Sequence, residues 1–172
     1  MKPIIFLSVF LLAITFNNAQ NIDSRAKYNG YDKQYGTHFP IELFKNKKGE
    51  NYQSPYLLGK YTLINFWSTT CEPCIEEMPI INLLKNKIGI KANLIAITYD
   101  TQIKVEKFLS THSFTFDMIT NVDYRILEQN KITRFPTSII IKEDGSILKY
   151  IGKVNEDNID EITKILLQNP MY

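Results

Sequence analysis

The strongest constraint on the fold is a pair of short apolar segments that flank an amphipathic one. Residues 61–67 (YTLINFW) and 93–98 (NLIAIT) are almost continuously apolar, which predicts two strands buried on both faces of a sheet. Between them, apolar side chains recur at helical spacing and predict a helix with one buried face: Ile80, Ile81, Leu84 and Ile88. Strand, helix and strand in this order form a right-handed crossover, so the two strands are expected to be parallel.

The rest of the chain continues the alternation of strands and helices. Further strands are predicted at 116–119, 138–141 and 147–151, and further helices at 103–109, 124–129 and 159–166. Asp144-Gly145 predicts a tight turn between the last two strands, which are therefore antiparallel. Near the N-terminus, the segment 41–44, a turn at 46–49 and Tyr52 predict a small hairpin. Together these elements predict an α/β fold: a mixed central β-sheet flanked by helices on both faces, with an N-terminal β-hairpin.

The first 20 residues have the composition of a secretory signal peptide. Lys2 precedes an apolar run at 4–16, which ends in the small and polar residues Asn17-Asn18-Ala19. The run is shorter than the ~20 residues that a membrane-spanning helix needs, so an uncleaved anchor is the weaker alternative. We therefore expect export, with the periplasm of a Gram-negative bacterium as the favoured compartment, secretion as an alternative, and membrane association only if the signal is uncleaved. Residues 21–36 are a polar lead-in, and 37–172 form one domain.

Composition excludes several classes of function. The chain has 20 Lys and Arg against 18 Asp and Glu, and this balanced charge argues against a nucleic-acid partner. With two Cys and two His in 172 residues, a closed four-ligand zinc site would need every one of them. We expect no metal and no cofactor. In an exported protein, two cysteines three positions apart favour a redox pair.

The spacing of Cys71 and Cys74 suits thiol chemistry at a helix N-terminus. The strand at 61–67 places Cys71 at the start of the following helix, where the helix dipole and free N–H groups favour the thiolate. Cys74 lies one turn further along, within reach of a mixed disulfide at Cys71. Pro73 fits the first turn of the helix, and Glu72 disfavours a strongly stabilised thiolate. The alternatives are a static disulfide or half of a metal site.

Residues 65–79 read NFWSTTCEPCIEEMP, and this stretch resembles a signature of the thioredoxin superfamily, that of the secreted TlpA/ResA-like thiol-disulfide reductases. Residues 58–60 and 134–137 (RFPT) are also similar to that family. The resemblance implies a thioredoxin-like fold, with Cys71 as the attacking thiol and Cys74 as the resolving thiol.

The resemblance also implies a substrate-binding edge. Pro136 would be a cis-proline beside the disulfide, and Phe135 would offer backbone hydrogen bonds to an extended substrate. Pro73 and Trp67 complete the expected substrate-binding set, and for Trp67 a core role is at least as well supported. For Pro136 the alternative is an ordinary trans proline at a strand entry.

Glu77 is a candidate catalytic acid or base. It follows Cys74 by three positions, so the two side chains share one face of the helix. A buried carboxyl group there would have a raised pKa and could exchange a proton with the resolving thiol. The alternative is a solvated glutamate like Glu76. Family similarity favours the proton relay, because ordinary thioredoxins carry a buried Asp where this chain has Asn65.

These observations predict an exported enzyme that reduces protein disulfides and is recharged by a membrane thiol-transfer electron donor. The family's known substrates suggest a part in cytochrome c maturation, or in defence against oxidative stress. One alternative is a peroxidase of the same fold, but Ile64 and Ser68 occupy the positions where the P-x-x-x-T-x-x-C pattern needs Pro and Thr. Another is a copper-binding chaperone, which would need C-x-x-x-C spacing and a distal histidine.

Overall fold

The structure is a computed structural model of the 172-residue chain, and it describes residues 35–46, 49–52, 57 and 59–168. The predicted signal peptide and all but the last two residues of the predicted lead-in lie outside the described residues. Within the described part of the chain, no helix is both long and apolar enough to cross a membrane.

A five-stranded sheet in the order β3-β2-β1-β4-β5 forms the centre of the molecule. Strand β1 is parallel to β2, and β2 is parallel to β3, whereas β4 is antiparallel to both β1 and β5. The predicted mixed sheet and the predicted parallel pairing of its first two strands are therefore confirmed. The strands are β1 Thr62–Phe66, β2 Asn93–Ile97, β3 Asp117–Ile119, β4 Thr137–Ile141 and β5 Ile147–Ile151.

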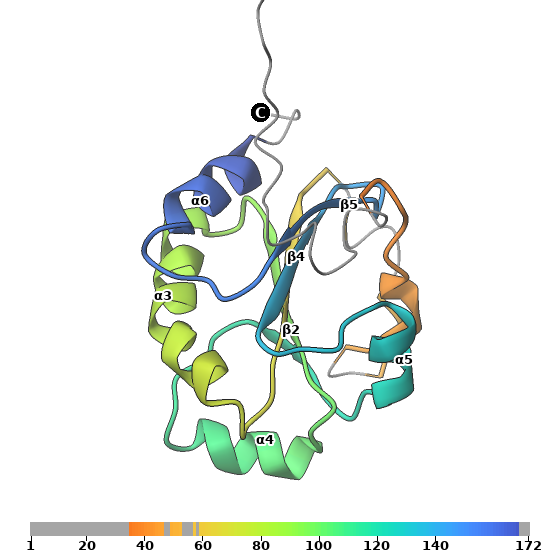
Figure 1. Cartoon of the computed structure of the whole chain (residues 1–172), viewed down its shortest axis with the longest axis vertical. Helices are drawn as coiled ribbons and strands as arrows, with labels where there is room; N and C mark the ends of the chain where they lie inside the picture. The colour runs from red at the N-terminus through yellow and green to blue at the C-terminus, as the bar shows by residue number, and fades with distance from the viewer. Residues whose placement is uncertain (1–34, 47–48, 53–56, 58, 169–172) are drawn as a thin grey trace, which may run out of the picture.

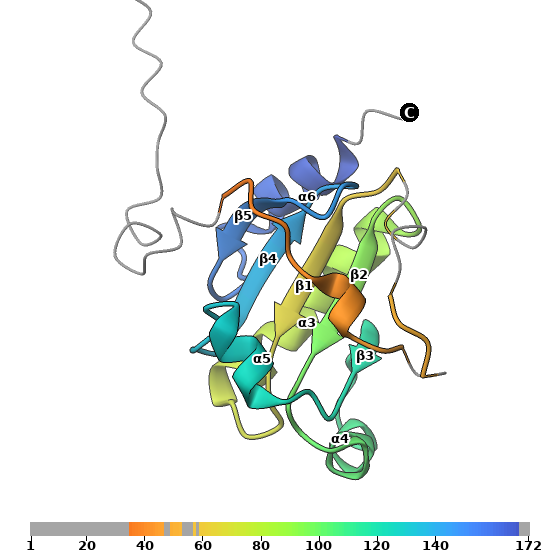
Figure 2. The ribbon, with the colours of Figure 1, turned by 90° about the vertical axis from the view of Figure 1, so that its right-hand side faces the viewer.

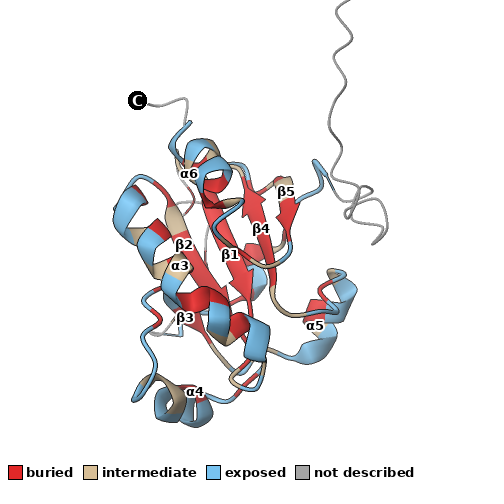
Figure 3. Cartoon of the chain, turned by 60° about the vertical axis from the view of Figure 1, so that its left-hand side comes forward, coloured by how far each residue is buried: buried red, intermediate tan, exposed pale blue. Residues whose placement is uncertain are grey.

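Helices cover both faces of this sheet, as the sequence predicts. Figure 1 shows α3 (Glu72–Ile88) and α6 (Ile159–Leu167) on one side and α5 (Tyr124–Gln129) on the other. Helix α4 (Gln102–Leu109) contributes Val105 to the same core as α3, whereas the N-terminal segment packs on the α5 side, as Figure 2 shows. In Figure 3 the strands are buried almost along their full length, while the helices expose their outer faces.

The predicted N-terminal hairpin differs from the structure in its first strand. Residues Ile41–Leu43 form a 3-10 helix, and Ile41 is buried in the core on the α5 side. Among the described residues, the hairpin is reduced to an antiparallel bridge between Lys45 and Asn51, with backbone hydrogen bonds from Tyr52 to Phe44 and from Asn46 to Glu50. The structure buries Ile41 and Phe44, three positions apart, and exposes Leu43, which is the spacing of a 3-10 turn and not the alternation of a strand.

Candidate active site

The two cysteines form a disulfide at the point where β1 leads into α3. Cys71 is the N-cap of α3, and its Cα lies 5.2 Å from the Cα of Cys74 in the first turn. The chain can turn here because Pro73 occupies a position whose N–H would have no partner in the helix. The Sγ atom of Cys71 accepts a hydrogen bond from the backbone N–H of Cys74 at 3.3 Å. The sulfur of Cys71 therefore sits at the positive end of the helix dipole.

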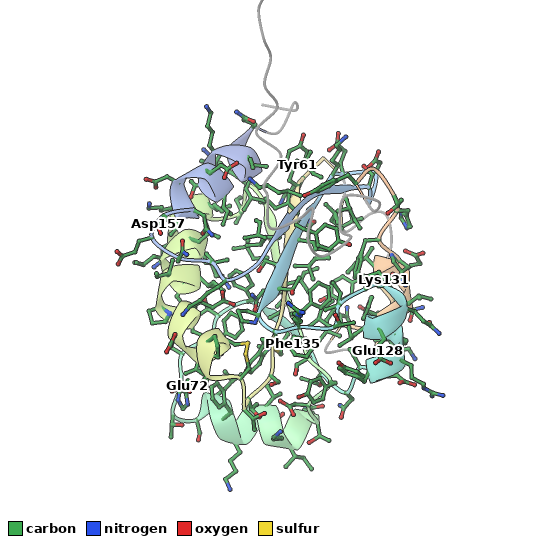
Figure 4. All side chains as sticks on the ribbon, in the orientation of Figure 1. Tyr61, Glu72, Glu128, Lys131, Phe135 and Asp157 are labelled. Atoms are coloured by element: carbon green, nitrogen blue, oxygen red, sulfur yellow. A yellow bond between two sulfur atoms is a disulfide. The ribbon has the colours of Figure 1, made fainter. Side chains whose placement is uncertain are left out.

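The two sulfur-bearing residues differ in their access to solvent. Cys71 is partly exposed, whereas Cys74 is 1% exposed and belongs to the core between α3 and the sheet. An incoming disulfide can reach Cys71 from solvent but cannot reach Cys74 in this conformation. Glu72 and Pro73, between them, are exposed. Figure 4 shows the disulfide at the end of α3, next to Glu72.

The loop before β4 lies at the same edge of the sheet. Thr137 pairs with Phe66 at the end of β1, which brings the preceding residues beside the loop that carries Cys71. The peptide bond between Phe135 and Pro136 is cis, as the family resemblance implies. In the described part of the chain, the backbone N–H and C=O of Phe135 have no recorded hydrogen-bond partner. The Phe135 ring, labelled in Figure 4, contacts Tyr99 with 5.7 Å between ring centroids.

Trp67 lies beneath this site and does not reach its surface. Its side chain is 0% exposed, and its ring contacts those of Phe108 and Phe114 at centroid distances of 5.5 and 5.3 Å. A side chain with no exposed surface cannot touch a substrate in this conformation. Its position favours the core role over the substrate contact that was also expected for it.

Glu77 is buried behind Cys74, on the same face of α3. The side chain is 1% exposed, so it is not a solvated glutamate like Glu76, which faces solvent and pairs with Lys153. Its Oε1 accepts a hydrogen bond from Asn65 Nδ2 at 2.8 Å, and its Oε2 accepts one from the Val154 N–H at 2.6 Å. Burial raises the pKa of Glu77 to about 7, although these two hydrogen bonds and the charge of Lys153 act in the opposite direction.

Asn65 links this carboxyl group to the strand that follows the cis-proline. The side chain is 1% exposed, and its Nδ2 also donates to Ser138 Oγ on β4 at 3.0 Å. Its Oδ1 is buried without a hydrogen-bond partner among the described residues. Asn65, Glu77 and Ser138 therefore form a buried polar network behind the resolving cysteine.

A second buried carboxylate lies on the other side of the disulfide, and the sequence reasoning gave it no role. Asp100 follows β2 and is 4% exposed. Its Oδ2 accepts a hydrogen bond from the backbone N–H of Thr69 at 2.7 Å, and its Oδ1 pairs with Lys104 Nζ at 2.6 Å. Burial raises the pKa of Asp100, but the bonds from Lys104 and Thr69 outweigh it and leave that pKa below its usual value. The sequence did contain a signal for this pair, because Asp100 and Lys104 are four positions apart at the start of a helix that follows a buried strand.

No cluster suited to a metal accompanies the cysteines. Among the described residues, no group of three or more His, Cys, Asp and Glu side chains converges on one point. The chemistry that the site offers is that of the two sulfur atoms and of the carboxyl groups beside them.

The mixed sheet and the Cys-X-X-Cys disulfide at the N-terminus of the first long helix place this protein in the thioredoxin-like class. Residues 35–150 match the family described as AhpC/TSA, and the chain belongs to that family. Thiol-disulfide oxidoreductase ResA of Bacillus cereus is 30% identical over 130 residues, which span 74% of this chain and 75% of that protein. Thioredoxin-like protein YneN of Bacillus subtilis is 28% identical over 149 residues, or 78% and 84% of the two chains.

Solved structures confirm the fold. The thioredoxin domain of a thiol-disulfide oxidoreductase from Bacteroides vulgatus superposes with a TM-score of 0.67 at 20% identity, covering 77% of this chain and 97% of that one. A putative thiol:disulfide interchange protein DsbE from Chlorobium tepidum gives a TM-score of 0.63 at 19% identity, covering 78% and 94%. The ResA relatives and the Cys71–Cys74 disulfide together support a thiol-disulfide oxidoreductase function.

Proposed function

We propose that this protein is an exported oxidoreductase that reduces disulfides in other proteins. The observation that carries the proposal is the asymmetry of the disulfide, with one sulfur open to solvent at a helix N-terminus and the other buried beside a carboxyl group. A static disulfide has no need of this arrangement, whereas a two-step exchange reaction needs one accessible and one protected sulfur.

In the reduced protein, the Cys71 thiolate attacks one sulfur of the substrate disulfide. A mixed disulfide forms between Cys71 and the substrate, and the other substrate sulfur leaves as a thiolate that takes up a proton. The Cys74 thiol then loses its proton, and its sulfur attacks the Cys71 sulfur; the bond between Cys71 and the substrate breaks, and the second substrate sulfur leaves as a thiolate that takes up a proton. Two electrons have passed to the substrate, and the Cys71–Cys74 disulfide has formed.

In this proposal Glu77 accepts the proton that Cys74 loses in the second step. The two residues are one helical turn apart, and both side chains are 1% exposed. With its pKa raised to about 7 by burial, Glu77 can gain or lose a proton near neutral pH. The reverse transfer returns the proton to Cys74 when a dithiol donor reduces the pair.

The free backbone groups of Phe135 support the proposed binding of an extended substrate segment. A strand of the substrate can donate to the Phe135 C=O and accept from its N–H, which would hold a cysteine of that segment at Cys71. Pro136 and the exposed Pro73 would border this segment on its two sides.

The proposal also includes the compartment of the protein, its electron donor and the process in which it acts. The signal peptide expected at 1–20 supports a location outside the cytoplasm, with the Gram-negative periplasm as the expected compartment. There, a membrane thiol-transfer protein would return electrons to the oxidised pair. Cytochrome c maturation and defence against oxidative stress are the processes suggested for its substrates.

Two alternative functions fit the site less well. A peroxidase of the same fold needs Pro and Thr where this chain has Ile64 and Ser68, and both residues are buried. A copper chaperone needs a third ligand near the cysteines, and no such group of ligands lies among the described residues.

The direction of electron flow is tested by the equilibrium reduction potential of the Cys71–Cys74 pair. The purified protein is equilibrated with thiol buffers of known potential, and the fraction of disulfide is measured after acid quenching and alkylation. A value near or below about −250 mV is expected for a reductant. A value of about −120 to −180 mV would place the protein with oxidants and isomerases, and the reductase proposal would be wrong.

A further inference from the structure

Among the described residues, the Asp100–Lys104 pair is the only ion pair with a buried carboxylate, and Asp100 contacts the segment that carries Cys71. The side chain of Asp100 is 3% exposed and that of Lys104 is 47% exposed, whereas every other ion pair there joins a carboxylate exposed by 42% or more. A buried carboxylate costs free energy unless it is paired and hydrogen-bonded. Its position therefore points to a role beyond surface charge.

The first contact of Asp100 fixes the loop between β1 and α3. Residues 67–71 connect β1 to α3, and the Thr69 N–H within this loop donates to Asp100 Oδ2 at 2.7 Å. The backbone of Asp100 is itself held, because its N–H donates to Thr98 Oγ1 and its C=O accepts from Asn121. The carboxylate thus connects the end of β2 to the residue two positions before Cys71.

Besides holding this loop, Asp100 acts electrostatically on Cys71. Two residues span at most ~7 Å, so the Asp100 carboxylate lies within roughly 10 Å of the Cys71 backbone. Its lowered pKa keeps it negative at neutral pH, and Lys104 balances that charge at 2.6 Å. When Cys71 is a thiolate, Asp100 opposes its charge and Lys104 supports it.

We propose that Asp100 is a positioning residue of the disulfide centre: it holds the loop that presents Cys71, and with Lys104 it sets how well the site stabilises a thiolate there. This inference rests on the proposed thiol-disulfide function and adds a second carboxylate, on the attacking side, to the one behind Cys74.

Other charged groups belong to the same surroundings. Glu72, Glu76 and Glu77 lie on α3, Lys153 follows β5 and pairs with Glu76, and Arg134 precedes Phe135. Since these groups stay unchanged in variants of Asp100 and Lys104, a difference between such variants reports the Asp100–Lys104 pair.

The test compares Asp100→Asn with Lys104→Met. In Asp100→Asn the amide oxygen can still accept from the Thr69 N–H, but the negative charge is lost and Lys104 remains. We expect the pKa of the Cys71 thiol to fall by about 0.5 to 1 unit, and the reduction potential to become less negative. Lys104→Met leaves Asp100 unbalanced, so the same pKa should rise, by a smaller amount because Lys104 is half-exposed.

Both quantities are measured on the intact protein. The pH dependence of alkylation of the reduced protein gives the pKa of Cys71, and exchange with a thiol buffer gives the potential. Lys87→Met is the matched control, because Lys87 pairs with Asp160 at the far end of α3, about 24 Å along the helix from Cys71. We expect neither quantity to move in the control.

If the pKa of Cys71 falls in Asp100→Asn and rises in Lys104→Met, the proposal is supported. A pair with a purely structural role would shift this pKa in the same direction in both variants. Shifts of the same sign, or none, would overturn the electrostatic role. The loop-holding role is tested by Asp100→Ala, which should attack a disulfide peptide more slowly than Asp100→Asn; equal rates would contradict it. If the wild-type pair did not exchange reversibly with the buffer, the proposed function itself would fail, and the two failures are thus distinguishable.

Discussion

A buried carboxyl group lies on each side of the disulfide, and the pKa values of these two groups are shifted in opposite directions. On the attacking side, Asp100 lies near the partly exposed Cys71 and has a lowered pKa. On the resolving side, Glu77 lies behind the buried Cys74, and its pKa is raised to about 7. Both carboxyl groups are at least 96% buried and accept two hydrogen bonds each.

Burial alone therefore does not decide the charge of these groups. Asp100 receives one of its hydrogen bonds from an ammonium group at 2.6 Å, which offsets the cost of burying the carboxylate. Glu77 receives its bonds from neutral N–H groups, while Lys153 is paired with Glu76. One side of the disulfide thus holds a fixed charge, and the other holds a group that can take up or release a proton.

The largest expected effect comes from removing each sulfur in turn. Cys71→Ser should abolish reduction of a disulfide peptide, because the accessible nucleophile is lost. Cys74→Ser should attack normally and then accumulate a mixed disulfide between Cys71 and the peptide. Mass spectrometry of the quenched reaction distinguishes the two products. A mixed disulfide in Cys71→Ser would mean that Cys74 is the attacking thiol and not the resolving one. Normal turnover in Cys74→Ser would mean that no resolving thiol is needed.

The next effect concerns the proton on the resolving side. Glu77→Gln removes the group expected to accept the Cys74 proton, so resolution of the mixed disulfide at pH 7 should slow roughly 100-fold. Single-turnover release of the second substrate thiol measures this step. Glu128→Gln is the control, because Glu128 is an exposed carboxylate on α5, on the other side of the sheet. An unchanged rate and pH profile in Glu77→Gln would make Glu77 a purely structural residue.

The same variant has a distinct effect on stability. The pKa of Glu77 is about 7 in the folded protein, against 4.5 for a free glutamate, so the folded state binds this proton more tightly. Its stabilising contribution is complete below about pH 4.5 and is lost as pH rises through 7. In the oxidised protein, the free energy of unfolding of Glu77→Gln should exceed that of the wild type increasingly with pH, by up to about 3 kcal/mol. Denaturant titrations at pH 4.5 and pH 8 measure it.

Much of the fold could be predicted because its central strands are buried on both faces. Strand β1 differs from prediction by one residue at each end and β2 by one residue at its C-terminal end, because continuous apolar runs mark fully buried strands clearly. Strand β5, which is only partly buried, also has the predicted bounds. The segment 41–44 was misassigned because a three-residue turn has too few residues to show a helical period. That Cys74 and Glu77 lie on the same side of α3 followed from helix geometry, since residues three apart share one face.

Asp100 could not be predicted in the same way. Its partner Thr69 lies 31 positions earlier, and only the parallel pairing of β1 with β2 brings the two together. Its burial also depends on how α4 packs after β2, which a local pattern does not determine. Likewise, the contact between Asn65 and Ser138 joins residues 73 positions apart across β1 and β4.

The smallest expected effect tests how Asn65 contributes to the resolving side. Asn65→Leu has nearly the same shape but removes the Nδ2 donor, so Oε1 of Glu77 loses its hydrogen bond. Because this bond lowers the pKa of Glu77, the variant should raise that pKa, and the pH profile of resolution should move to higher pH by about half a unit. The Oδ1 atom that is also lost has no partner among the described residues, so its removal leaves no donor unpaired there.

Ser138→Ala is the matched control, because Ser138 contacts Asn65 but has no recorded contact with Glu77. We expect its pH profile to remain within 0.2 units of wild type, an allowance that reflects the indirect contact. A shift to lower pH in Asn65→Leu would show that Asn65 stabilises the neutral form of Glu77, with its amide reversed so that Oδ1 accepts the carboxyl proton. In that case the resolving side would be organised around the protonated acid, and its difference from the ionised Asp100 would be greater than the present hydrogen bonds indicate.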